Sequence, residues 1–166
     1  MAVPPKPPVG ASRNALELWL AAAVEADTTL RNNVLHNTHA TLEQLVGRKV
    51  PGDIKVVAIE EVPTDLYLVR RFEGAVEPAE PEGTEAQMLR TSIHVIAMQQ
   101  PGFWEKVAEN PKAVLAAELR LNLPPQVNVH VLDETANLAY LVLHHPPHLQ
   151  GWQPPPAIRQ QIMLKR

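Results

Sequence analysis

Residues 127–142 have the sequence VNVHVLDETANLAYLV, and residues 54–69, IKVVAIEEVPTDLYLV, align with them when the chain is shifted by 73 positions. The alignment needs no gap and ends on identical residues, with Tyr67-Leu68-Val69 lying over Tyr140-Leu141-Val142. In both stretches apolar residues form two runs around a polar turn, which is typical of two short strands joined by a tight connection. We therefore predict a β-hairpin in each stretch.

The similarity continues upstream and indicates two copies of one module. Further identities at the same shift pair Leu16 with Leu89, Val34 with Val107, Asn37 with Asn110, Ala40 with Ala113, and Leu42 with Leu115. Apolar residues of this region recur at the spacing of an amphipathic helix in both copies. Asn110 suits a helix N-cap and Pro111 the first helical position, so we predict a further helix over Pro111–Leu119.

The predicted fold class is α+β, with two tandem helix–helix–β-hairpin repeats packed as one layered domain of pseudo-twofold symmetry. A single hairpin is marginal in water, so the strands of the two copies are expected to pack together under the helices. The predicted divisions are a proline-rich N-terminal tail (1–11), repeat 1 (12–71), an acidic proline-rich linker (72–84), repeat 2 (85–144) and a proline-rich C-terminal extension (145–166).

The composition excludes several classes of function. The chain has 166 residues, a formal net charge of -3 and no cysteine. The lack of a basic excess argues against nucleic-acid binding, and the lack of cysteine excludes disulfides, thiolate nucleophiles and sulfur-ligated metals. No apolar stretch is long enough to span a bilayer, and the N-terminal residues do not resemble a signal peptide, so we expect a cytoplasmic protein that does not bind membranes.

Residues 108–143, AENPKAVLAAELRLNLPPQVNVHVLDETANLAYLVL, resemble the helix–hairpin unit of the nitrile hydratase alpha subunit. The same unit occurs in the nitrile hydratase-like leader peptides (NHLP) of modified natural products. Gln100-Pro101-Gly102-Phe103 resembles the family's earlier Asp-Pro-x-Phe helix start, and HHPPHLQGW (144–152) resembles its proline-rich exit from the last strand. The resemblance covers roughly residues 12–152 and implies a nitrile hydratase alpha-like fold.

The chain departs from this family at the metal site. The resemblance implies low-spin iron or cobalt held by a C-x-x-C-S-C claw just after the second strand of the first copy, and thiolates are the soft ligands that such a metal requires. The corresponding positions are near Arg71, Gly74 and Val76, in the sequence VRRFEGAVEP. We therefore expect that the family's metal claw is lost and that the chain has no cofactor.

Three histidines lie within five residues, His144, His145 and His148, and are the candidate ligands for a metal of another kind. Adjacent residues of a strand point to opposite faces, so only one of His144 and His145 would share a site with His148. His36 and His39 form a second pair, three residues apart. We interpret all of these as surface or turn histidines and expect no bound metal.

Acidic pairs stand at equivalent turns of the two copies, Glu60-Glu61 and Asp133-Glu134. Because the feature is duplicated, it favours turn solvation or strand-end capping over a catalytic dyad. No phosphate-binding glycine loop and no obvious catalytic triad accompany them, so the sequence predicts no catalytic residue.

The resulting hypothesis is a non-catalytic, cysteine-free nitrile hydratase alpha-like module, a pseudoenzyme used for protein recognition or assembly. Within the resembled family, such modules also act as leader peptides that modifying enzymes recognise. A core peptide rich in Cys, Ser or Thr would be expected there, and the residues after Gly151 contain none of the three. The alternative is a metal-dependent hydro-lyase or hydrolase of the nitrile hydratase type that uses histidines in place of the claw.

The expected partner is a protein: a modifying enzyme, a transporter, a companion subunit, or a second copy of the chain. Large aromatic side chains are the natural anchors of such contacts. The candidates are Trp19, Phe103, Trp104 and Trp152. The alternative is that these side chains close the core, and we favour this for Trp19 and Phe103.

Overall fold

The computed structural model describes residues 13–47, 53–72 and 85–164. The chain divides into two compact units. Unit 1 comprises the residues up to Glu60 together with Glu134–Leu143, and unit 2 comprises Glu61–Asp133 together with the residues from His144 onward. Each unit therefore combines segments that lie far apart in the sequence.

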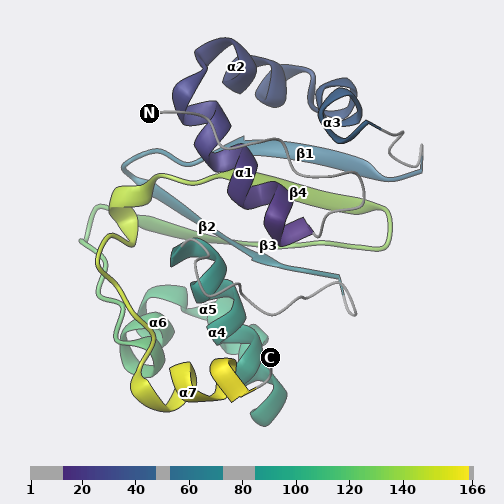
Figure 1. Cartoon of the computed structure of the whole chain (residues 1–166). Coiled ribbons are helices and arrows are strands. Elements are labelled where there is room, and N and C mark those ends of the chain that lie inside the picture. The colour runs from purple at the N-terminus through teal and green to yellow at the C-terminus, as the bar shows by residue number, and fades with distance from the viewer. Residues whose placement is uncertain (1–12, 48–52, 73–84, 165–166) are drawn as a thin grey trace. The chain divides into compact units, whose positions relative to one another are not determined.

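Unit 1 contains three helices and a two-stranded parallel sheet (Figure 1). Its elements are α1 (Arg13–Ala26), α2 (Thr28–His36), α3 (Thr38–Val46), β1 (Lys55–Glu60) and β4 (Leu138–Leu143). The strand register runs from Lys55 opposite Leu138 to Glu60 opposite Leu143. The helices α2 and α3 contact β1, and the buried core consists of Leu20, Val24, Val34, Leu42, Leu141 and Leu143.

Unit 2 has the same kind of architecture, a two-stranded parallel sheet accompanied by helices. Its elements are β2 (Asp65–Arg70), α4 (Glu85–Gln99), α5 (Phe103–Glu109), α6 (Pro111–Leu119), β3 (Asn128–Asp133), the 3-10 turn η1 (Pro146–His148) and α7 (Pro156–Leu164). The register pairs Asp65 with Asn128 and Arg70 with Asp133. The helix α4 contacts β2, while α5 and α6 contact β3.

Local sequence signals account for the helix boundaries. The Asp27 side chain accepts a hydrogen bond from the Leu30 N–H at 3.1 Å and so caps α2. Gly47, in the left-handed region at φ 80°, ends α3, because glycine adopts that conformation without steric cost. Pro111 occupies the first turn of α6, and the predicted helix over Pro111–Leu119 is confirmed.

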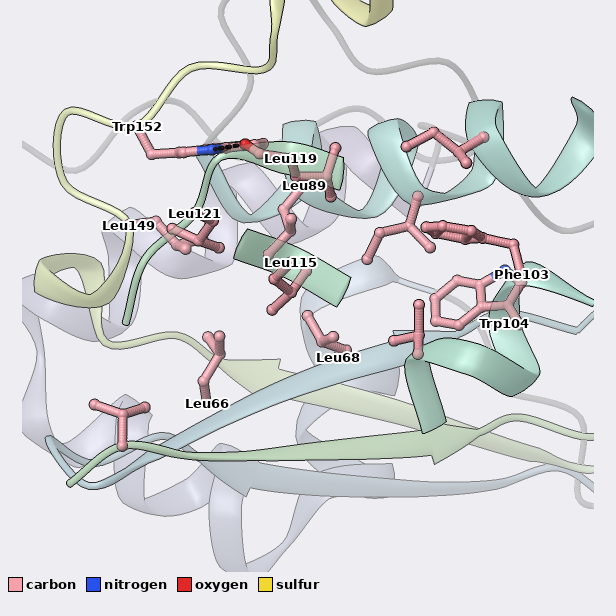
Figure 2. Packing of buried hydrophobic residues seen from close by; sticks show 14 residues of the cluster. Leu66, Leu68, Leu89, Phe103, Trp104, Leu115, Leu119, Leu121, Leu149 and Trp152 are labelled. Atoms are coloured by element: carbon pink, nitrogen blue, oxygen red, sulfur yellow. Dashed lines mark hydrogen bonds between the residues drawn. The ribbon is translucent and has the colours of Figure 1, made fainter. Parts of the chain in front are cut away.

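The core of unit 2 includes residues from the C-terminal extension (Figure 2). Leu149 and Trp152 pack with residues of β2, α4, α5 and α6, and the Trp152 indole N–H donates to the Leu119 carbonyl at 2.9 Å. That carbonyl lies at the C-terminal end of α6, where backbone oxygens have no helical partner. The proline-rich extension is therefore part of the folded unit.

The predicted mixture of helices and strands is confirmed, but the prediction of two β-hairpins is wrong in its strand pairing. Each strand pairs along its length, in parallel, with a strand of the other predicted hairpin. Across each turn only isolated antiparallel bridges occur, Val62 with Asp65 and Thr135 with Leu138. An alternating pattern determines which side chains share a face, but it carries no information about which strand lies alongside. The short connection within each stretch therefore does not determine the pairing.

Three further points concern the extent of the chain. No helix in the described ranges is long and apolar enough to cross a membrane. The predicted N-terminal tail (1–11) lies outside the described residues, and so does the predicted linker (72–84) apart from its first residue. The proposed boundaries of the two repeats remain predictions.

Candidate functional site

The turn at residues 61–65, which precedes β2, is organised by a buried carboxylate. The Glu61 side chain is only 1% exposed. It accepts a hydrogen bond from the Tyr67 N–H and another from the His145 N–H, both at 2.8 Å. The His144 Nδ1 lies 3.2 Å from Glu61 Oε2. The two backbone donors thus offset the cost of burying this carboxylate.

Unit 1 contains a corresponding arrangement at the turn before β4. Glu134 is buried and accepts a hydrogen bond from the Tyr140 N–H at 2.8 Å. In both turns the acceptor binds the backbone amide six residues further along the chain. The expectation that the acidic pairs serve strand-end capping is confirmed for Glu61 and Glu134, because each carboxylate holds the backbone of the strand that follows it.

The segment that leaves β4 brings His144, His145 and His148 to this turn. The His148 Nε2 lies 2.8 Å from the Val62 carbonyl oxygen and 2.9 Å from that of Asp65. A carbonyl oxygen only accepts, so this nitrogen carries a proton and has no lone pair for a metal. The rings of His145 and His148 meet edge to face, with their centroids 5.0 Å apart.

The other predicted histidine pair is not brought together as a site. His39 lies on α3, and its Nε2 is 3.5 Å from Glu43 Oε1 one turn further along the helix. Nowhere in residues 13–47, 53–72 and 85–164 do three or more His, Cys, Asp or Glu side chains form a group that could hold a metal ion.

A histidine–aspartate pair that the sequence did not predict lies at the start of the sheet of unit 2. The His130 Nε2 is 2.7 Å from Asp65 Oδ1, and the His130 ring stacks on Tyr67 at a centroid distance of 4.9 Å. The Thr64 hydroxyl donates to Asp65 Oδ2 at 2.9 Å. The hydrogen bond from His130, then that from Thr64, and the charges of His130 and His148 hold the pKa of Asp65 below its usual value, against the opposing effect of burial.

The residues at the positions where the resembled family binds its metal are not suited to hold a metal ion. Arg71 follows β2 directly and its side chain is buried, at 5% exposure. A guanidinium is permanently positive and has no lone pair to donate to a cation. Gly74 and Val76 lie outside the described residues, and neither residue type has a side-chain ligand. The donor set that low-spin iron or cobalt requires is therefore absent from these positions.

The four candidate aromatic contacts lie in or against the two cores. Trp19 packs against the core of unit 1, and Phe103, Trp104 and Trp152 belong to that of unit 2. Phe103 is almost fully buried, whereas the Trp104 ring also lies 5.9 Å below the guanidinium of Arg70. Phe103, Trp104 and Trp152 are at most 9% exposed, whereas Trp19 is half-buried. The role of these four residues as partner contacts stays a prediction.

A groove with a volume of about 470 Å³ lies along α5 and α6 of unit 2. Its lining residues are Gln100, Phe103, Lys106, Glu109, Asn110, Ala113, Val114, Ala117 and Glu118. Apolar side chains from both helices thus meet a polar border. Nothing in the hydrophobic pattern predicted it, because a groove between two short helices depends on their packing.

The fold was compared with known proteins. No protein-family model and no curated protein matches the chain. Among solved structures, it is similar to two double mutants of the Fe-type nitrile hydratase from Comamonas testosteroni Ni1, in which two histidines are replaced by tryptophan or by alanine.

The first match has a TM-score of 0.53 and covers 91% of this chain and 66% of the other; the second has a TM-score of 0.54 and covers 87% and 64%. The sequence identity is 20% in both, so the likeness is one of fold. The chain spans just under two thirds of the length of those chains. It therefore has a nitrile hydratase-like α+β fold.

Proposed function

We propose that this chain is a non-catalytic protein-recognition or assembly module built on a nitrile hydratase-like fold. The observation that carries the proposal is the buried Arg71 at the position where the resembled family begins its metal claw. A buried cation there opposes metal binding. The full sequence contains no cysteine that could supply the thiolate ligands from another position. A nitrile hydratase-like fold that lacks the metal ligands can still serve to bind other proteins.

The use of the histidines supports the same proposal. The Nε2 of His148 is taken up by two carbonyl oxygens, and the backbone of His145 is held by Glu61. These contacts attach the C-terminal segment to the turn at residues 61–65. A metal site that used the Nε2 of His148 would have to give up its two contacts with carbonyl oxygens.

Elemental analysis tests the non-catalytic half of the proposal. The full chain is produced without an affinity tag in medium supplied with iron, cobalt, nickel and zinc, and is then assayed for metal and for nitrile hydration. We expect less than stoichiometric metal and no hydration above the blank. Stoichiometric metal that disappears in His145→Ala with His148→Ala, but not in the control His36→Ala, would overturn the proposal in favour of the histidine enzyme.

Co-expression tests the recognition half. The untagged chain is produced together with each product of the neighbouring genes in turn, including any modifying enzyme, transporter or companion subunit. We expect one of them to co-elute with the chain as a complex of defined stoichiometry. If every pair elutes separately at micromolar concentration, the recognition role is wrong. A leader-like role further requires that a bound modifying enzyme alters a peptide fused after residue 166.

We also propose that the chain consists of two copies of one module, and element bounds and strand register support this. The helices α3 and α6 start at residues 38 and 111, a difference of 73, and they end with the same difference. In the sheet of unit 1, Lys55 pairs with Leu138. Moving the first by 73 positions forward and the second by 73 back gives Asn128 and Asp65, which pair in unit 2.

A further inference from the structure

The turn at residues 61–65 gathers carboxylates and histidines at the point where the C-terminal extension begins. Each of its two carboxylates lies within 3.2 Å of a histidine nitrogen. Histidine is the residue type whose ordinary change of charge falls between pH 5 and 8. The titratable side chains of unit 2 that meet at this turn are Glu61 and Asp65 from the turn, Tyr67 from β2, His130 from β3, and His144, His145 and His148 from the segment after β4.

The contact between His144 and Glu61 depends on a proton. Both oxygens of the buried Glu61 carboxylate accept a hydrogen bond from a backbone N–H. The His144 Nδ1 lies 3.2 Å from Glu61 Oε2, is shielded from solvent and makes no hydrogen bond in the described part of the chain. A carboxylate oxygen only accepts, so this contact is attractive only when Nδ1 carries a proton, and an imidazolium carries one on each nitrogen. Protonation of the ring therefore turns this contact into an ion pair.

The contact between His130 and Asp65 changes in the same direction. The His130 Nε2 lies 2.7 Å from Asp65 Oδ1. This hydrogen bond is the largest cause of the lowered pKa of Asp65, and the charges of His130 and His148 act in the same sense, because a charged ring attracts the ionised carboxylate. One contact opposes the trend, since the rings of His145 and His148 are 5.0 Å apart and repel when both are charged. The two histidine–carboxylate contacts are shorter and outweigh it.

We propose that these groups form a pH-dependent latch, which holds residues 144–152 to the turn at residues 61–65 more tightly in mild acid than at neutral pH. The segment is already attached there through the His145 N–H and the His148 Nε2. Each ion pair gained at the turn adds to the same attachment. The inference uses only these contacts and does not rest on the proposed recognition function.

Hydrogen–deuterium exchange of the full, untagged chain, followed by NMR, tests the latch. The His145 N–H donates to Glu61 and the Trp152 N–H to the Leu149 carbonyl, so both report on the attachment of this segment. Their protection factors, which correct for the intrinsic effect of pH on exchange, should rise at least about threefold from about pH 7.5 to about pH 5.5, because the two ion pairs form over this range. The double variant His130→Gln with His144→Gln should lose this rise.

His39→Gln is the matched control. Its Nε2 also lies near a carboxylate, 3.5 Å from Glu43 Oε1, but on α3 of unit 1, so its replacement should leave the rise in protection unchanged. Circular dichroism of each variant verifies that the fold is retained. If the double variant does not fold, the native chain decides, because the rise must then follow the NMR titration of the His144 ring. Protection that stays constant or falls toward pH 5.5, a rise that persists in a folded double variant, or a rise lost in the control would each overturn the proposal.

Discussion

At the scale of single residues, Glu61 is the side chain on which the turn before β2 depends. Glu61→Ala would leave the partly buried N–H groups of Tyr67 and His145 without their acceptor. Each orphaned donor costs about 1–3 kcal/mol, so we expect the free energy of unfolding to fall by roughly 3 kcal/mol in urea titrations. Glu61→Gln keeps one oxygen acceptor for the two N–H groups and turns an NH2 donor toward the other, so it should lose less than Glu61→Ala but still a measurable amount, and the exposed Glu25→Ala should lose almost nothing. Equal losses in all three variants would contradict this role.

Asp65 gives a pH dependence of defined sign. Its pKa is lowered in the folded protein, so the ionised carboxylate stabilises the fold above the unfolded value near 3.8, and this contribution is lost as the pH falls through the lower, folded pKa. Asp65→Asn should therefore lower the melting temperature between pH 5 and about 7 relative to the native chain, and the difference should vanish toward acid. In His130→Gln, NMR titration should place the Asp65 pKa closer to its usual value. A difference that grows toward acid would refute the assignment.

Residue patterns in the sequence could predict part of this site. The duplicated acidic pairs correctly indicated strand-end capping, because a pair repeated at both turns has a local structural cause. The contact of His130 with Asp65 was missed because the two residues lie on neighbouring strands only in the parallel pairing. Contacts between distant segments have no local sequence signal, so the site around residues 61–65 required the structure.

At the scale of elements, the segment between β4 and α7 closes the core of unit 2. Trp152→Phe removes the hydrogen bond to the Leu119 carbonyl while it keeps an aromatic ring, and should cost about 1 kcal/mol of unfolding free energy. Trp152→Ala also empties the space beside Leu149 and should cost about 3–5 kcal/mol. Chemical denaturation followed by the fluorescence of the remaining Trp19 and Trp104 measures both. Comparable small losses in the two variants would mean that the segment contributes little packing.

Helix and strand positions were predictable to a large extent, whereas strand partners were not. Pro111 marked the start of α6 because a proline at the first helical position leaves no useful donor unpaired. The apolar runs of residues 127–142 predict the strands β3 and β4. Which strand lies beside β1 is decided by the packing of two cores, one around Leu141 and Leu143 and the other around Leu66 and Leu68.

At the scale of the whole molecule, this pairing means that neither half of the chain contains a complete unit. Unit 1 takes β4 from the C-terminal half, and unit 2 takes β2 from the N-terminal half. Hairpins, by contrast, would give each half its own pair of strands. A fragment of residues 1–72 lacks Leu141 and Leu143 of its core, and a fragment of residues 85–166 lacks Leu66 and Leu68.

We therefore expect each fragment alone to unfold without a cooperative transition. Each fragment contains only one strand of each sheet, so backbone groups and apolar side chains of both strands lose their partners. Mixing the two fragments should restore a cooperative transition with a midpoint that rises with their concentration, since folding then includes association. Circular dichroism during heating checks both statements. A cooperative transition in the fragment of residues 1–72 alone would mean that β1 and β2 suffice for each other, and it would favour the hairpins over the parallel exchange of strands.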